Sequence, residues 1–208
     1  VALWGRSQGG HAGLFAGELA PTYAPELTVV GTVVGAPASD LAAAFPLSGY
    51  LGGRTAAYNW DIGYSYADAF GFDLDTFYDA YTKSRVDALL AEGGCLPEMA
   101  ALGDELGSAG FDVSQANDPR LVMLLEESSP GHRRQSAPVR IHQGTADEDV
   151  PQFATDALVD QLCAAGDPIE YVVYPGENHP QSTQNHVPEM VAFTQARFDG
   201  APFTSTCP

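Results

Sequence analysis

Three short motifs contain the residue types of a serine nucleophile and of the groups that would activate it. The first is Gly5-Arg6-Ser7-Gln8-Gly9, which follows the apolar run 1–4 and precedes a segment with helical spacing. A serine on a turn this tight lies at the N-terminus of the next helix, where free backbone N–H groups stabilise an oxyanion. The motif predicts that Ser7 is an acyl-transfer nucleophile and that the backbone N–H of Gln8 serves the oxyanion hole.

A serine nucleophile needs a histidine that accepts its proton and a carboxylate that orients this histidine. Three acids compete for the orienting role in the loop 144–151, which follows an expected strand: Asp147, Glu148 and Asp149. We favour Asp147, because it is closest to the end of the strand and precedes Val-Pro, where a helix is expected to begin. Asp149 is an alternative cap for that helix.

Five histidines compete for the role of general base. We favour His179, because it lies in the loop after the next expected strand, and His186 at the start of the last helix is the main alternative. His142 lies within a strand, His11 on the helix after Ser7, and His132 in a loop near proline and glycine. The predicted triad is therefore Ser7, Asp147 and His179, which occur along the chain in the order nucleophile, acid and base.

Alternating patterns of strand and helix must position these residues, which predicts an α/β fold with a parallel sheet. A helix is expected from residue 7 to residue 20, where Pro21 would end it. The other expected elements are strands at 1–4, 27–37, 138–144 and 169–175, and helices at 151–165 and 187–198.

Helical pieces broken by glycine replace this pattern between residues 38 and 137. We interpret them as a helical cap inserted into the core, which divides the chain into 1–37, 38–137 and 138–208. The aromatic residues of the insertion either form its own core, which we favour, or line an acyl-binding tunnel. They are Tyr50, Tyr58, Trp60, Tyr64, Tyr66, Phe70, Phe72, Phe77, Tyr78 and Tyr81.

The bulk composition limits the classes of protein and partner. With 208 residues, 45% of them hydrophobic, the chain can bury one core. Its net charge of -18 argues against nucleic acid and anionic membrane surfaces as partners. No apolar run is long enough to span a membrane. Because Val1 lies within an expected strand, we expect the chain to derive from a longer polypeptide. The three cysteines point the same way, because an odd number leaves one thiol without a partner in this sequence; three unpaired thiols in a cytosolic protein are the alternative.

Five further segments complete a pattern: Leu19-Ala20-x-x-Tyr23-Ala24-Pro25-Glu26-Leu27, Gly94-Cys95-Leu96-Pro97, Asp147-Glu148-x-Val150-Pro151, Tyr174-Pro175 and Phe198-Asp199-Gly200. This pattern resembles the C-terminal half of the secretory lipases of the Candida antarctica lipase A type. The resemblance implies an α/β-hydrolase fold, with the C-terminal part of a mostly parallel sheet flanked by helices and with an inserted helical cap. It also implies a triad of Ser7, Asp147 and His179, carboxylic esters of lipid type as substrates, no cofactor or metal, and secretion.

The same resemblance implies a disulfide between Cys163 and Cys207, and a partner for Cys95 in the N-terminal half. The run Val1 to Trp4 would be an unpaired edge without that half, so we expect association with the N-terminal fragment or with a second copy. Two departures concern the oxyanion hole: Gln8 replaces a glycine of the named lipase, and no second donor is found.

The expected function is that of a serine carboxylic ester hydrolase. Two alternatives remain open at this point. One is a serine peptidase of the prolyl-oligopeptidase type, which shares the order of the triad. The other is a weak or inactive fragment that needs its N-terminal half.

Overall fold

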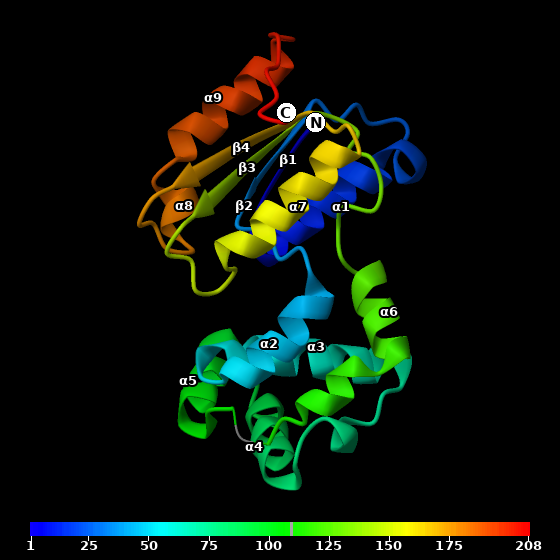
Figure 1. Cartoon of the computed structure of the whole chain (residues 1–208), viewed down its shortest axis with the longest axis vertical. Helices are drawn as coiled ribbons and strands as arrows, with labels where there is room; N and C mark the ends of the chain where they lie inside the picture. The colour runs from blue at the N-terminus through cyan, green and yellow to red at the C-terminus, as the bar shows by residue number, and fades with distance from the viewer. Residues whose placement is uncertain (109) are drawn as a thin grey trace. The chain divides into compact units, whose positions relative to one another are not determined.

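The computed structural model describes residues 1–108 and 110–208 (Figure 1). The chain divides into two compact units, each of which is considered by itself. The first unit joins Val1–Asp40 to Ser129–Pro208, and the second is Leu41–Ser128. The second unit is thus somewhat shorter than the insertion expected at 38–137. Its role as a cap over an active site stays a prediction.

The first unit contains a four-stranded sheet in which all neighbouring strands are parallel (Figure 1). The strands are β1 (Ala2–Arg6), β2 (Gly31–Gly35), β3 (Val139–Gly144) and β4 (Ile169–Tyr174), and they lie side by side in chain order. The predicted parallel sheet is confirmed. Strand β2 begins later than expected, because Leu27 lies in a turn. The N–H of Leu27 donates to the carbonyl of Ala24, and the side chain of Leu27 is exposed.

Helices cover both faces of this sheet. Figure 1 shows α1 and α7 on one face and α9 on the other. Because neighbouring residues of a strand point to opposite faces, Val34 packs into the cluster that includes Leu14 and Leu158, whereas Val33 packs against Met190 and Phe193. The helices of this unit are α1 (Gln8–Tyr23), α7 (Gln152–Ala164), the short α8 (Gln181–Gln184), which the sequence did not predict, and α9 (Val187–Phe198).

Helix α1 continues through Pro21 to Tyr23, so the expectation that Pro21 ends the helix is wrong. Proline has no backbone N–H to donate to the carbonyl four residues earlier. In this helix that carbonyl, on Gly17, accepts the backbone N–H of Ser136 at 3.2 Å instead. A tertiary contact thus replaces the hydrogen bond that the proline removes.

The C-terminal segment lies along part of β4. Thr206 donates its N–H to the carbonyl of Ile169 at 2.7 Å and accepts the N–H of Tyr171 on its hydroxyl at 3.0 Å. Cys207 forms a disulfide with Cys163 of α7, which is the pairing that the sequence resemblance implied. These contacts cover β4 at one edge of the sheet, whereas β1 forms the other edge.

The second unit is helical and has its own core. Four of the aromatic residues singled out in the sequence are buried in it, namely Trp60, Tyr66, Phe77 and Tyr78, which confirms the favoured interpretation for these four. Tyr50 is instead largely exposed. The elements are α2 (Leu41–Leu51), α3 (Arg54–Phe70), α4 (Ala80–Ala91), α5 (Leu96–Leu106) and α6 (Pro119–Glu127), with 3₁₀ turns at Leu74–Thr76 and Val113–Asn117.

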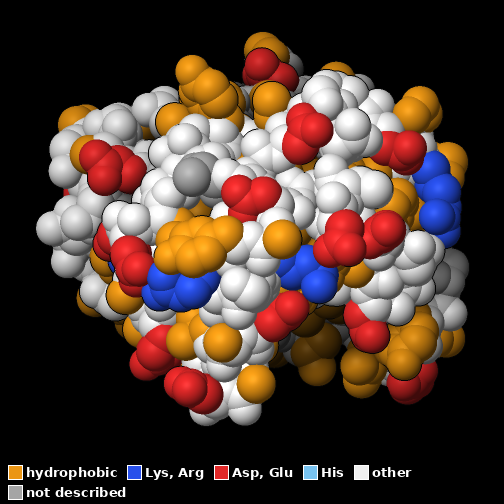
Figure 2. All heavy atoms as spheres, turned by 90° about the horizontal axis from the view of Figure 1, so that it is seen from below, with side chains coloured by type: hydrophobic (Ala, Val, Ile, Leu, Met, Phe, Trp, Pro, Cys, Tyr) orange, Lys and Arg blue, Asp and Glu red, His pale blue; other side chains and the backbone are white. Residues whose placement is uncertain are grey.

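The surface is predominantly acidic. On the face drawn in Figure 2, Asp and Glu side chains are more numerous than Lys and Arg side chains. This agrees with the 27 acidic and nine basic residues of the chain. The few cations therefore matter most where they are buried beside carboxylates.

The turn from β1 into α1 depends on one very close approach. A Cβ atom on Gly5 would overlap the carbonyl of Gly9 and lie 2.7 Å from the backbone nitrogen of Gly10. A Cβ on Gly9 would meet nothing within 4 Å. Of the two glycines that flank Ser7 in the motif, the structure therefore requires only Gly5.

We expect opposite effects from two substitutions that add the same methyl group. Gly5→Ala should lower the free energy of unfolding by about 1–3 kcal/mol or more, because the strand and the helix must move apart. Gly9→Ala should be neutral or stabilising by up to about 1 kcal/mol, because alanine favours the helix. Urea unfolding followed by circular dichroism measures both, and equal losses would contradict the assigned packing.

Candidate active site

Ser7 lies on the turn between β1 and α1 in a strained backbone conformation. Its φ is 56° and its ψ is -123°, which is unusual for a residue other than glycine. Its N–H donates to the carbonyl of Gly35 at 2.8 Å, and its own carbonyl accepts the N–H of His11 at 3.0 Å. The side chain makes no capping hydrogen bond to α1. The hydroxyl of Ser7 is thus not engaged in capping α1.

Gln8 is the first residue of α1 and is exposed. The first N–H groups of a helix have no intrahelical acceptor, and the positive end of the helix dipole lies there. The backbone N–H of Gln8 can therefore donate to an anionic oxygen beside Ser7. A glutamine is compatible with this role, since only the backbone group is needed.

Asp147 lies in the loop after β3, and its side chain is fully buried. One carboxylate oxygen accepts the backbone N–H groups of Asp149 at 3.0 Å and Val150 at 2.8 Å. The other oxygen accepts a hydrogen bond from the side chain of Gln143 at 3.3 Å and faces His179. The carboxylate is thus held on both oxygens.

His179 lies in the loop after β4 and is 7% exposed. Its Nδ1 atom is 2.8 Å from Oδ2 of Asp147. An ionised carboxylate can only accept, so Nδ1 carries the proton and Nε2 is left as the basic nitrogen of the neutral ring. Within the described residues, no hydrogen bond joins the Ser7 hydroxyl to His179. The structure therefore pairs the acid with the base, and the complete triad stays a prediction.

The parallel sheet brings the loops of Ser7, Asp147 and His179 to the same end of the sheet, where the carboxyl ends of the strands lie. Ser7 follows β1, Asp147 follows β3 and His179 follows β4, and the carboxyl ends of parallel strands lie at one end of the sheet. The backbone N–H of Ala36, after β2, donates to the carbonyl of His142 at 2.8 Å, which links the middle of this end.

The competing acids have other environments. Glu148 is exposed. Asp149 does not occupy the capping position of α7, which belongs to Pro151. Among the competing histidines, His11 hydrogen-bonds the carbonyl of Ala38 through Nδ1 at 2.7 Å, and His132 is exposed.

Gln143 is a site residue that the sequence reasoning missed. It is fully buried on β3, and its amide nitrogen contacts Asp147 and donates to the carbonyl of Val150 at 3.1 Å. Its amide oxygen accepts the hydroxyl of Thr155 at 2.7 Å. No signal in the sequence distinguished Gln143, because Arg140 and His142 are also polar residues of the same strand.

His142 is fully buried on β3 in a chain of polar contacts. Arg140 donates from Nε to His142 Nε2 at 3.1 Å, so the proton of the neutral ring lies on Nδ1, 2.9 Å from the hydroxyl of Tyr174. That hydroxyl donates in turn to Glu189 at 3.1 Å. Burial, and to a lesser extent the charge of Arg140, lower the pKa of His142 to about 4. His142 is therefore a neutral link in this network.

The low pKa of His142 predicts a pH dependence of stability. An unfolded-chain histidine titrates near 6.5, so between about pH 6.5 and 4 the unfolded state binds more protons than the folded state. The free energy of unfolding should then fall as the pH falls through this window. In His142→Gln this fall should be smaller by on the order of 1–3 kcal/mol.

Urea unfolding at a series of pH values measures this effect, with Ile141→Val as the control for lost packing on the same strand. The control should keep the wild-type slope, because it removes no titrating group. A wild-type slope in His142→Gln would show that His142 does not stay neutral in the folded protein.

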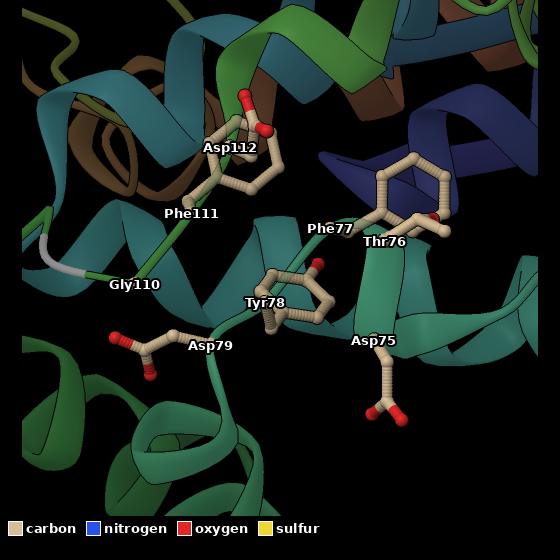
Figure 3. Close-up of a pocket in the computed structure, with 8 residues that line it drawn as sticks. All are labelled: Asp75, Thr76, Phe77, Tyr78, Asp79, Gly110, Phe111 and Asp112. Atoms are coloured by element: carbon tan, nitrogen blue, oxygen red, sulfur yellow. The ribbon is translucent and has the colours of Figure 1, made fainter.

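Other candidate sites are weaker. A depression of about 460 Å³ in the second unit is lined by the segments 75–79 and 110–112 (Figure 3). Its lining includes Asp75, Asp79 and Asp112, yet no group of three or more His, Cys, Asp or Glu residues in 1–108 and 110–208 is placed to hold a metal ion. In that part of the chain, no helix has the length and apolar character that crossing a membrane requires.

Comparison with known proteins shows that the chain is similar to lipases and esterases. The family model for secretory lipases matches residues 1–48. A trichothecene C-3 esterase from Fusarium sporotrichioides is 31% identical over 200 residues, which are 89% of this chain and 44% of the esterase. A probable inactive lipase from Mycobacterium tuberculosis is 27% identical over 215 residues, which are 98% of this chain and 46% of that protein.

Among solved structures, Candida antarctica lipase A superposes with a TM-score of 0.82 at 23% identity, over 100% of this chain and 50% of the lipase. This likeness is one of fold, and it confirms the predicted α/β-hydrolase architecture. The chain spans about half the length of the curated relatives that it matches. The chain is thus similar in sequence to the C-terminal half of the secretory lipases and shares the α/β-hydrolase fold.

Proposed function

We propose that this chain carries the Ser7, Asp147 and His179 triad of a serine carboxylic ester hydrolase. The observation that carries this proposal is the 2.8 Å hydrogen bond between buried His179 and Asp147, at the end of the sheet where Ser7 occupies its strained turn. An acid and a base paired in this way are what a serine nucleophile requires.

In the proposed reaction, Ser7 Oγ attacks the ester carbonyl while His179 Nε2 takes the hydroxyl proton. Asp147 stabilises the resulting imidazolium through Nδ1, and the backbone N–H of Gln8 donates to the oxyanion. The tetrahedral intermediate then expels the alcohol, which leaves with the proton from His179, and an acyl-serine remains. Water, deprotonated by His179, attacks this ester and releases the acid and free Ser7.

The proposed substrates are hydrophobic carboxylic esters. The relatives named lipases and those named trichothecene esterases support this class, because all these names denote ester hydrolysis. The secretory family and the disulfide between Cys163 and Cys207 support a secreted protein, since disulfides persist in oxidising compartments.

A second possibility is that the chain alone is weak or inactive. The chain spans only about half the length of its relatives. One of these relatives is named a probable inactive lipase. Gln8 supplies one donor to the oxyanion, and the loss of a second donor typically reduces turnover by about 10²–10³-fold. Activity and covalent labelling must therefore be measured separately.

We expect a fluorophosphonate probe to label Ser7 and p-nitrophenyl esters to be hydrolysed, because the triad makes the serine nucleophilic. Ser7→Ala should abolish both, and Asp147→Asn should lower the ester rate by about 10⁴-fold, because His179 would lose its favoured tautomer. Mass spectrometry locates the label, and a series of acyl lengths defines the substrate class.

Ser84→Ala is the matched serine control. Ser84 is exposed on α4 of the second unit, where its hydroxyl donates to the carbonyl of Tyr81 at 2.8 Å, so its loss should leave labelling and turnover unchanged. Three results would change the proposal. Labelling without turnover would indicate an incomplete oxyanion hole. No labelling of folded protein would contradict the proposed function of the chain alone, and cleavage of amides as fast as esters would favour a peptidase.

We further propose that β1 pairs with a polypeptide equivalent to the N-terminal half of the relatives. Within residues 1–108 and 110–208, strand β1 is bonded only to β2, and Trp4 on it is 43% exposed. The indole N–H of Trp4 donates to the hydroxyl of Thr194 on α9 at 2.8 Å. On the same helix, the side chains of Val191 and Phe198 are exposed. An open strand edge flanked by apolar side chains favours association.

Light scattering of the chain, alone and mixed with such a polypeptide, tests this pairing. We expect a one-to-one complex that Trp4→Arg weakens at least about tenfold, because a charge would be buried at the contact. Tyr81→Arg, at an exposed aromatic of the second unit, should leave binding unchanged. A strictly monomeric chain that does not bind would contradict the pairing, and a dimer of the chain alone would indicate a second copy as the partner.

A further inference from the structure

His186, which directly precedes α9, lies between two carboxylates. Its Nε2 is 3.1 and 3.0 Å from the two carboxylate oxygens of Glu177, and its Nδ1 is 3.3 Å from Glu189. Each ring nitrogen of His186 thus faces a carboxylate, and the ring bridges Glu177 and Glu189.

Two further groups hold this ring in place. The ring of Tyr174 stacks on it with centroids 3.5 Å apart and an angle of 13° between the planes. The hydroxyl of Tyr174 and the guanidinium of Arg140 both donate to Glu189, each at 3.1 Å. Since the side chain of Arg140 is only 14% exposed, Glu189 is anchored from the interior of the sheet. The position of His186 is thus fixed on its ring face and on both nitrogens.

Glu177 connects His186 to the loop that bears the base. Its carboxylate also accepts a hydrogen bond from the side chain of Asn185 at 3.1 Å. Glu177 is two residues before His179 in the chain, and only Asn178 separates them. A carboxylate held by His186 and Asn185 therefore restrains the backbone that carries His179.

The backbone of Glu177 also connects to the loop that bears the acid. Its carbonyl accepts the N–H of Ala146, the residue before Asp147, at 3.0 Å. A Cβ on Gly144 would overlap this same carbonyl, so the two loops are in direct contact. Glu177 is thus the residue at which the loop of Asp147 and the loop of His179 meet.

We propose that His186 and Glu177 are positioning residues, which hold the loops of Asp147 and His179 in the register that their hydrogen bond requires. This inference rests on the proposed function, because it concerns the acid and base of that triad. Neither residue contacts the reacting atoms. Their effect on catalysis passes through the proton on His179 Nδ1.

The expected consequence is specific. If Glu177 loses its anchor, the hydrogen bond between Asp147 and His179 loosens, and the proton of His179 moves in part to Nε2. That tautomer cannot accept the proton of Ser7. We expect kcat to fall about 10–100-fold while KM changes little, because small misplacements of catalytic groups act on the chemical step.

The experiment compares His186→Phe and Glu177→Gln with Met190→Ala. Phenylalanine keeps a ring against Tyr174 but has no donors, and glutamine keeps the volume of Glu177 but removes its charge. Met190 is buried in α9 against Val33 and Phe193, so Met190→Ala destabilises the same helix without touching Glu177. Circular dichroism first establishes that each variant is folded at the temperature used.

The main readout is the tautomer of His179, measured with ¹⁵N-labelled histidine through two-bond ¹H–¹⁵N correlations and assigned with His179→Gln. The wild type and Met190→Ala should carry the proton on Nδ1. In His186→Phe and Glu177→Gln the Nε2–H form should become populated. The double variant should show no more than the larger single effect, since both residues act through one contact.

This readout needs no turnover, so it separates the two ideas. A folded wild type with the proton on Nδ1 but no fluorophosphonate labelling of Ser7 would contradict the proposed function and still test the positioning. An unchanged tautomer in folded His186→Phe and Glu177→Gln would overturn the positioning role. The same shift in Met190→Ala would also overturn it, because general loosening of α9 would then suffice.

Discussion

Parallel pairing of four strands in chain order is the constraint on which the first unit depends. Because β1, β2, β3 and β4 all run in the same direction, the loops that follow them lie at the carboxyl end of the sheet. Ser7 and His179, which lie near opposite ends of the chain, are thereby placed at the same end of the sheet. Helices lie on both faces of the sheet, and β2 in its interior is fully buried, as is typical of a parallel sheet.

The polar groups of the sheet are organised around its few cations. Arg140 is largely buried and contacts Glu170, Glu189 and His142. A buried charge persists only when partners compensate for the lost hydration. In a chain with three times as many acidic as basic residues, such partners are plentiful, and Arg140 determines that Glu170 and Glu189 are held in fixed positions.

The two edges of the sheet differ in a way that bears on what the chain does alone. The segment ending at Cys207 covers part of β4 and is fixed by the disulfide to Cys163. Strand β1 has no such cover within the described residues, although it leads directly into Ser7. Ser7 is therefore positioned by a strand that, among the described residues, is bonded on one side only, so contacts made by a partner strand would act directly on the turn that holds Ser7.

The sequence by itself determined the elements and the residue types of the candidate site. The Gly5 to Gly9 motif, the loops of Asp147 and His179 and the alternation of strands and helices followed from local spacing, while the pairing of Cys163 with Cys207 followed from the family resemblance. Only the tertiary structure decided that α1 continues through Pro21, because Ser136 is brought to the freed carbonyl of Gly17. It likewise decided the roles of Gln143, His142 and Glu177, because these depend on partners brought close by folding from distant parts of the chain, which local sequence spacing does not encode.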